Sequence, residues 1–154
     1  MDFQKQYDLV RSSRKVLLDY CATLTDADFL AAHPAFGRGS VRDLLVHNAN
    51  TYQWWIGTHA LQGRPDFTDK DSLTDIAQAV SVFDQVDVFV VEFCERFKDD
   101  PTATLPASLG EKKFLSTPIE LFTHAITHEF HHKGQILSLT RQLGYVPIDT
   151  DIIR

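Results

Sequence analysis

Apolar residues recur at helical spacing in four long segments of this 154-residue chain, and none alternates in the manner of a half-buried strand. The periodicity predicts helices over about 2–24, 40–61, 72–98 and 118–142. Because each predicted helix has one apolar face, the four can bury those faces only by packing against one another. The sequence therefore predicts an all-α four-helix bundle, with residues 1–154 forming a single domain.

The fourth segment has the clearest boundaries. Thr117 is suited to the N-cap position, Pro118 to the first helical turn, and Glu120 completes a capping box with Thr117. Gly144 is a typical residue just beyond a helix C-terminus. Ser40 marks the start of the second helix in a similar way. These residues predict an uninterrupted helix over 118–142.

Residues 99–116 lack clear periodicity and contain two prolines and one glycine. We expect a loop with at most short extended pieces. A loop of this length is unusual within a compact domain and often covers a functional site, but a plain surface connection fits the pattern equally well.

Composition narrows the class of partner. A net charge of −6 argues against a nucleic-acid or anionic-membrane binder, though not against a small anionic substrate met by a local Arg or Lys. The polar N-terminus lacks a signal-peptide pattern, and no run approaches about 18 apolar residues. Cys21 and Cys94 lie far apart within helical patterns, so we expect two buried free thiols. These features predict a cytoplasmic protein.

Four histidines lie within nine positions of the fourth segment, at 124, 128, 131 and 132. His128 and His132 are four apart, so both imidazoles share one helical face and can reach one cation. That face is otherwise apolar, and two imidazoles are costly to bury unless they are hydrogen-bonded or coordinated. We therefore favour a metal site over a hydrogen-bonded core pair or a face tilted toward water. The other members of this face are Leu121, Ala125, Ile136, Leu139 and Leu143.

His128, Glu129 and His132 literally satisfy the H-E-x-x-H motif of zinc proteases. No His or Glu follows His132, so a third ligand from downstream would have to be Asp149 or Asp151. Glu129 also points about 100° away from the histidine face. The protease interpretation is therefore disfavoured, and a third ligand is expected from upstream.

The upstream candidates are His33, His47, His59 and His124. His124 lies about 12 Å along the helix axis from His132, which is too far for both to bind one ion. We therefore expect His124 either to contact a metal-ligating residue without binding the ion itself, or to be partly exposed. His47 and His59 are about 18 Å apart on one helix, so at most one of them can be the third metal ligand. Their spacing does not indicate which one it is. His33 in its loop and His131 off the face are expected at the surface.

Arg14 interrupts the apolar face of the first predicted helix. We expect its side chain to reach solvent from the edge of that face. The alternative is an inward-facing cation that binds a substrate carboxylate.

Two segments and the C-terminal end resemble the DinB/YfiT-like family. Residues 40–55 resemble the family's second helix, and residues 121–135 resemble its fourth-helix signature of two His four apart followed by a basic residue, Gly and Gln. Residues 143–151 are similar to its tail. The likeness covers nearly the whole chain in order.

This resemblance implies a four-helix bundle that holds a divalent metal through His47, His128 and His132. Lys133 stands where the family often has Arg, which leaves the ligands intact. Three neutral imidazoles leave coordination positions open, as in catalytic sites. Zinc or nickel is the expected metal, with iron next. Asn50 and Gln135 each lie three residues after a ligand and are candidates to line the site or orient a ligand.

The resemblance also implies several functions. The preferred one is an enzyme that transfers a low-molecular-weight thiol to a small electrophile, or isomerises such a substrate, with metal-dependent hydrolysis next. The competing class is a metal- or ligand-binding stress-response protein without turnover. Members of the family often form homodimers.

Aromatic content also favours a homodimer. The chain has 11 Phe, two Trp and four Tyr, more ring surface than one small core is expected to hide. Trp54 and Trp55 are adjacent and cannot both face inward, so one is expected in the core and the other at a rim or interface.

Overall fold

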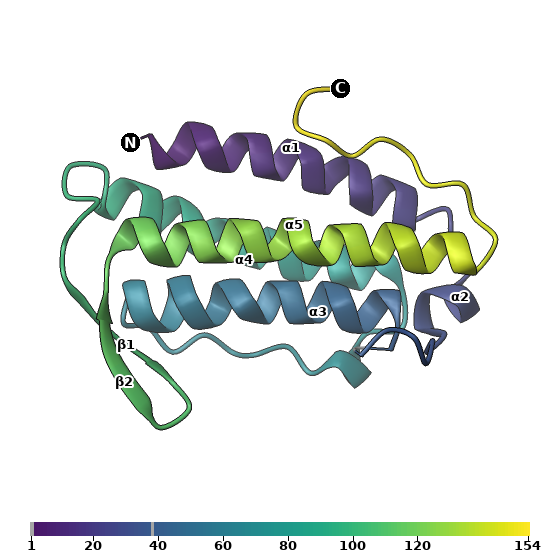
Figure 1. Cartoon of the computed structure of the whole chain (residues 1–154), viewed down its shortest axis with the longest axis horizontal. Coiled ribbons are helices and arrows are strands. Elements are labelled where there is room, and N and C mark those ends of the chain that lie inside the picture. The colour runs from purple at the N-terminus through teal and green to yellow at the C-terminus, as the bar shows by residue number, and fades with distance from the viewer. Residues whose placement is uncertain (1, 38) are drawn as a thin grey trace.

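The computed structural model describes residues 2–37 and 39–154, and its long helices lie lengthwise beside one another (Figure 1). This arrangement confirms the predicted helical bundle. Within the described residues the bundle is formed by α1 (Phe3–Cys21), α3 (Val41–Tyr52), α4 (Ile76–Arg96) and α5 (Pro118–Gln142).

The first helix is shorter than predicted. Asp2 caps α1 by accepting from the Lys5 amide, and the helix ends at Cys21. The side chain of Thr25 then accepts from the Asp28 amide and begins a separate short helix, α2 (Asp26–Leu30), which the periodicity did not distinguish from α1.

The second predicted helix divides into two parts. Ser40 caps α3 as expected, by accepting from the amide of Asp43. After Tyr52 the chain continues as a π-helix, η1 (Gln53–Ala60). Gly57 in η1 leaves room for the returning chain, because a Cβ there would lie 3.1 Å from Cγ of Pro65. Hydrophobic periodicity alone does not reveal this widening of the helix.

The third predicted helix begins later than expected. Asp75 accepts from the amide of Gln78 and caps α4, so the helix starts at Ile76 rather than near residue 72. A separate 3-10 turn, η2 (Lys70–Ser72), precedes it.

Residues 105–116 form an antiparallel hairpin of β1 (Leu105–Leu109) and β2 (Lys112–Ser116), seen beside one end of the bundle in Figure 1. These strands are the short extended pieces expected between 99 and 116. Gly110 has a φ of +60°, a conformation that favours glycine, and allows the tight turn. Leu105 and Ala107 are buried, and β1 contacts η1.

The fourth helix matches its predicted bounds of 118–142. Thr117 and Glu120 form the reciprocal capping box, and Gly144 has a φ of +93° just beyond the helix. Beyond α5 the chain turns back and runs along α1 (Figure 1).

The core lies between the long helices and is rich in rings. Phe3, Phe93 and Phe122 contact one another with ring centroids 5.0–5.7 Å apart. Cys21 and Cys94 are both free and buried, as expected. Across residues 2–37 and 39–154, no helix has the length and apolarity needed to cross a membrane.

The expected excess of aromatic surface is not found. Among the described residues, Phe67 is the only exposed aromatic side chain. Trp54 and Trp55 are both half-buried, so neither is fully in the core. The remaining large exposed apolar side chains are aliphatic, which removes the aromatic argument for an interface.

Candidate metal centre

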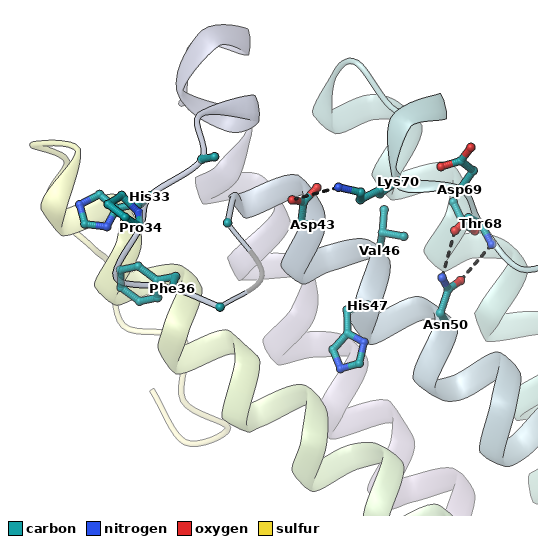
Figure 2. Close-up of a pocket in the computed structure, with 13 residues that line it drawn as sticks. His33, Pro34, Phe36, Asp43, Val46, His47, Asn50, Thr68, Asp69 and Lys70 are labelled. Atoms are coloured by element: carbon teal, nitrogen blue, oxygen red, sulfur yellow. Dashed lines mark hydrogen bonds and ion pairs between the residues drawn. The ribbon is translucent and has the colours of Figure 1, made fainter. Parts of the chain in front are cut away.

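Three histidines from two helices meet where α3 packs on α5. Nε2 of His128 lies 2.7 Å from Nε2 of His47 and 3.0 Å from Nε2 of His132. One ring nitrogen from each of the three lies within 4.8 Å of the other two, a grouping able to hold a metal ion. Figure 2 shows the ring of His47 projecting from α3 toward α5.

The histidine pair lies at the edge of the buried face of α5, not along its middle as expected. His132 is buried, but His128 is only half-buried and Leu143 is also half-buried. The middle of the buried face passes instead through Glu129 and Lys133. A site at this edge lies between the buried core and the solvent.

Gln135 contacts the outer nitrogen of a candidate ligand. Its Oε1 lies 2.6 Å from Nδ1 of His132, while its Nε2 lies 3.2 Å from Nε2 of His131. An amide oxygen can only accept, so Nδ1 of His132 carries the proton. In the neutral ring, Nε2 of His132 then has a lone pair directed at the cluster, which is the tautomer that a metal ligand requires.

His124 stands outside the cluster and contacts it through its ring. It stacks on His128 at a centroid distance of 5.5 Å and meets Trp55 at 5.0 Å. Trp55 in turn contacts Phe114 of the hairpin at 6.4 Å. Burial lowers the pKa of His124, which favours its neutral form beside the cluster. The hairpin thus reaches the histidines through a chain of rings.

Two other candidate ligands lie elsewhere. His59 lines a separate pocket of about 540 Å³ beneath the hairpin, together with Ser108 and Phe114. Its Nε2 is buried and has no hydrogen-bond partner among the described residues. His33 is half-buried in its loop, where Nδ1 accepts from the amide of Ala35.

A pocket of about 860 Å³ opens beside His47 (Figure 2). Asn50 lines this pocket, and its side-chain amide is hydrogen-bonded to the backbone of Thr68, with bonds of 3.0 and 2.9 Å. Asn50 therefore holds the pocket wall in place. Lys70 and Asp43 add one charge of each sign, with Nζ and Oδ2 3.9 Å apart. Other lining residues are His33, Pro34, Phe36, Val46 and Asp69.

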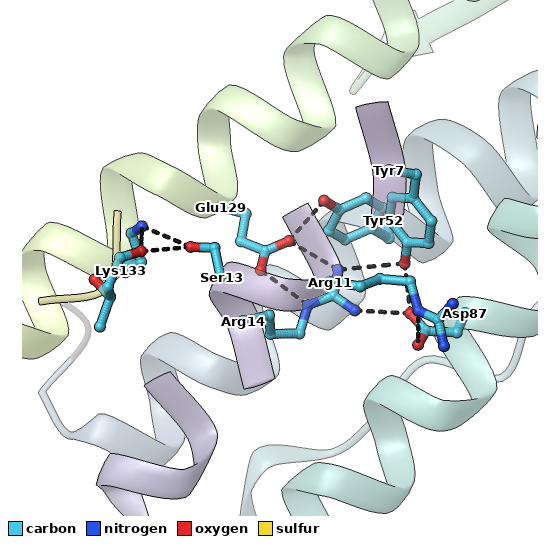
Figure 3. Close-up of polar contacts among 9 residues, drawn as sticks. Tyr7, Arg11, Ser13, Arg14, Tyr52, Asp87, Glu129 and Lys133 are labelled. Carbon is cyan, nitrogen blue, oxygen red and sulfur yellow. Dashed lines mark hydrogen bonds and ion pairs between the residues drawn. The ribbon is translucent and has the colours of Figure 1, made fainter. Parts of the chain in front are cut away.

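The prediction that Arg14 reaches solvent is wrong, because its side chain is only 3% exposed. Its guanidinium donates to both oxygens of Glu129, at 2.8 and 2.9 Å, and to Oδ1 of Asp87 at 2.7 Å (Figure 3). Burial is the largest single influence on Arg14 and opposes its charge, but the interactions with Glu129, Tyr7 and Tyr52 together outweigh burial and raise the arginine pKa well above its usual value. Arg14 is therefore an inward-facing cation, as in the alternative interpretation, but the carboxylates that it binds belong to the protein itself.

Glu129 belongs to this buried network and does not face the histidines. Besides Arg14, it accepts from Oη of Tyr52 at 2.6 Å. Burial raises the pKa of Tyr52 well above its usual value, so the hydroxyl stays protonated and donates. With both oxygens engaged, Glu129 is not placed as the general base of a zinc protease. The sequence signal was the charge of Arg14 on an otherwise apolar face, which did not identify Glu129 or Asp87 as its partner.

Lys133 attaches the C-terminal segment to the bundle. It is buried, and Nζ donates to Oγ of Ser13 at 2.8 Å and to the carbonyl of Thr150 at 2.6 Å (Figure 3). The pKa of Lys133 is lowered chiefly by burial. Lys133, the basic residue that follows His132, thus binds α1 and the C-terminal segment through Ser13 and Thr150.

Comparison with known proteins agrees with the helical-bundle fold. The model of the DinB family matches residues 2–154, and the chain belongs to this family. It is also similar to the uncharacterized protein YizA of Bacillus subtilis (strain 168), with 26% identity over 138 residues, which cover 87% of this chain and 83% of YizA.

Proposed function

We propose that the chain is a metal-dependent enzyme in which His47, His128 and His132 hold one divalent ion. The observation that carries this proposal is the convergence of three ring nitrogens within 4.8 Å, from two helices. The donor set fits such an ion, because Gln135 fixes the tautomer in which His132 offers Nε2. Zinc or nickel suits three imidazoles, with iron third.

Three protein ligands leave coordination positions open, and a bound divalent ion lowers the pKa of a water or thiol that occupies one of them. The pocket beside His47 provides room for a small molecule there. Lys70 and Asp43 offer it both signs of charge, which suits a polar molecule that carries a carboxylate and an ammonium group.

The preferred reaction is transfer of a low-molecular-weight thiol to a small electrophile, or a thiol-dependent isomerisation. The chain does not supply this thiol itself. Cys21 and Cys94 are buried, and burial raises the pKa of each to about 12, so neither is a thiolate at neutral pH. The thiol therefore enters as a cosubstrate. Two reduced cysteines also fit the cytoplasmic location that we propose.

The test compares zinc-loaded with chelator-treated protein. Conjugation of glutathione or cysteine to a chlorodinitrobenzene is measured beside hydrolysis of a nitrophenyl ester. We expect conjugation that needs the metal and is lost in His128→Ala, while His59→Ala retains it. Metal-dependent ester hydrolysis without conjugation would support the hydrolase alternative. Stoichiometric metal without turnover of either substrate would support a non-catalytic binding protein.

We also retain the homodimer as a proposal. The outer face of α4 exposes Val80, Val88 and Val91, a surface that a second copy could cover. Light scattering at tens of micromolar protein should give twice the 17.5 kDa chain mass. A monomer mass would contradict the proposal.

A further inference from the structure

We propose that the hydrogen bond between Tyr52 and Glu129 fixes the spacing of the helices that carry the histidines, which makes Tyr52 a positioning residue for the metal. This inference rests on the proposed metal site. It assigns a role to a buried network that makes no direct contact with the ion.

The bond lies beside the histidine cluster on both helices. Tyr52 follows His47 by five residues on α3, and Glu129 is the neighbour of His128 on α5. Oη of Tyr52 donates to Oε2 of Glu129 at 2.6 Å, and both side chains are buried. The two helices are thus joined by a short polar contact that lies one residue from His128 along α5 and five residues from His47 along α3.

Arg14 gives this contact a fixed direction. Its guanidinium holds both oxygens of Glu129, so the carboxylate cannot turn away from Tyr52 without breaking a charged hydrogen bond. A buried ion pair contributes little net stability compared with apolar packing, but it imposes one geometry. The network therefore restrains the position of α5 against α3 more than it stabilises the fold.

Tyr7 supplies a matched control within the same network. Its side chain is as fully buried as that of Tyr52, and its Oη donates to Oδ1 of Asp87 at 2.6 Å. That bond joins α1 to α4, and neither helix carries a candidate ligand. In Figure 3 the rings of the two tyrosines lie next to each other, with centroids 6.1 Å apart, on one side of the Arg14 guanidinium. Tyr52→Phe deletes one bond, which joins the ligand-bearing helices α3 and α5. Tyr7→Phe deletes a bond of equal length to Asp87 and a second bond of 3.2 Å that Tyr7 accepts from Nη2 of Arg14, and neither of these joins α3 to α5.

The experiment compares Tyr52→Phe with Tyr7→Phe. Zinc affinity is measured by competition with a chromophoric chelator, the absorption spectrum of the cobalt(II) form is recorded, and urea unfolding of the metal-free proteins gives their stability. We expect both variants to lose stability, Tyr7→Phe at least as much as Tyr52→Phe because the Tyr7 hydroxyl makes two hydrogen bonds. Zinc affinity should fall about tenfold or more in Tyr52→Phe only, as for other groups that orient ligands from outside, and the cobalt spectrum should change only there.

A metal-free readout keeps this test independent of the proposed function. In protein with nitrogen-15-labelled histidine, Tyr52→Phe should shift the imidazole signals of His47 and His128 by NMR, and Tyr7→Phe should not. Equal effects of the two variants, or none in Tyr52→Phe, would overturn the positioning role. Failure of the wild-type protein to bind zinc or cobalt while the NMR contrast holds would reject the metal proposal and leave the helix-spacing role supported.

Discussion

Nε2 of His128 lies 2.7 Å from Nε2 of His47, although 81 positions separate the two residues in the chain. The contact joins α3 to α5, two helices whose packing is supported by the buried bond from Tyr52 to Glu129. The candidate metal centre is therefore assembled by tertiary packing and does not belong to one helix.

Replacing Gln135 should weaken metal binding without unfolding the protein. Gln135→Leu removes the acceptor for Nδ1 of His132, so the imidazole loses its fixed tautomer and orientation. We expect zinc affinity to fall by about 10- to 100-fold, measured by chelator competition. Gln135→Glu keeps an acceptor oxygen and should retain most of the affinity. Equal affinity in Gln135→Leu and the wild type would show that the contact does not orient the ligand.

Loss of Arg14 should destabilise the fold strongly. Arg14→Met leaves Glu129 buried without its cation, a change that costs about 3–5 kcal/mol. Arg11 also binds Asp87, but its side chain is 46% exposed, so Arg11→Met should cost less than about 1 kcal/mol. Urea unfolding of both variants measures the difference. Similar small losses would mean that Arg14 is not the central cation of the network.

Mild acid should destabilise the metal-free protein partly through His59. Burial lowers the pKa of His59, so the folded state favours the neutral ring. Stability is full above the unfolded value near 6.5 and falls as pH drops below it, because the unfolded chain binds the proton first.

His59→Gln removes this titrating group and should flatten the loss of unfolding free energy between about pH 7 and pH 5. A slope in His59→Gln that equals the wild type would contradict the assignment.

The sequence specifies those parts of the fold that depend on local signals. Thr117, Pro118, Glu120 and Gly144 set the bounds of α5 because caps act within one turn of the helix end. The π-helix after Tyr52 escaped prediction, since its widening involves packing of the returning chain on the helix.

The site divides in the same way. Helical spacing placed His128 and His132 together, because residues four apart share a face. Helical spacing could not decide whether His47 or His59 is the third metal ligand, and only the resemblance to a known family favoured His47. Arg14 was misplaced because an arginine at an apolar position does not identify a partner 115 residues away.

Metal content of single-alanine variants tests the central claim most directly. Elemental analysis of the purified wild-type protein should give close to one divalent ion per chain. His47→Ala, His128→Ala and His132→Ala should each lose most of it, and His59→Ala should retain it. Full metal in His132→Ala or His47→Ala, or loss in His59→Ala alone, would contradict the three-histidine site.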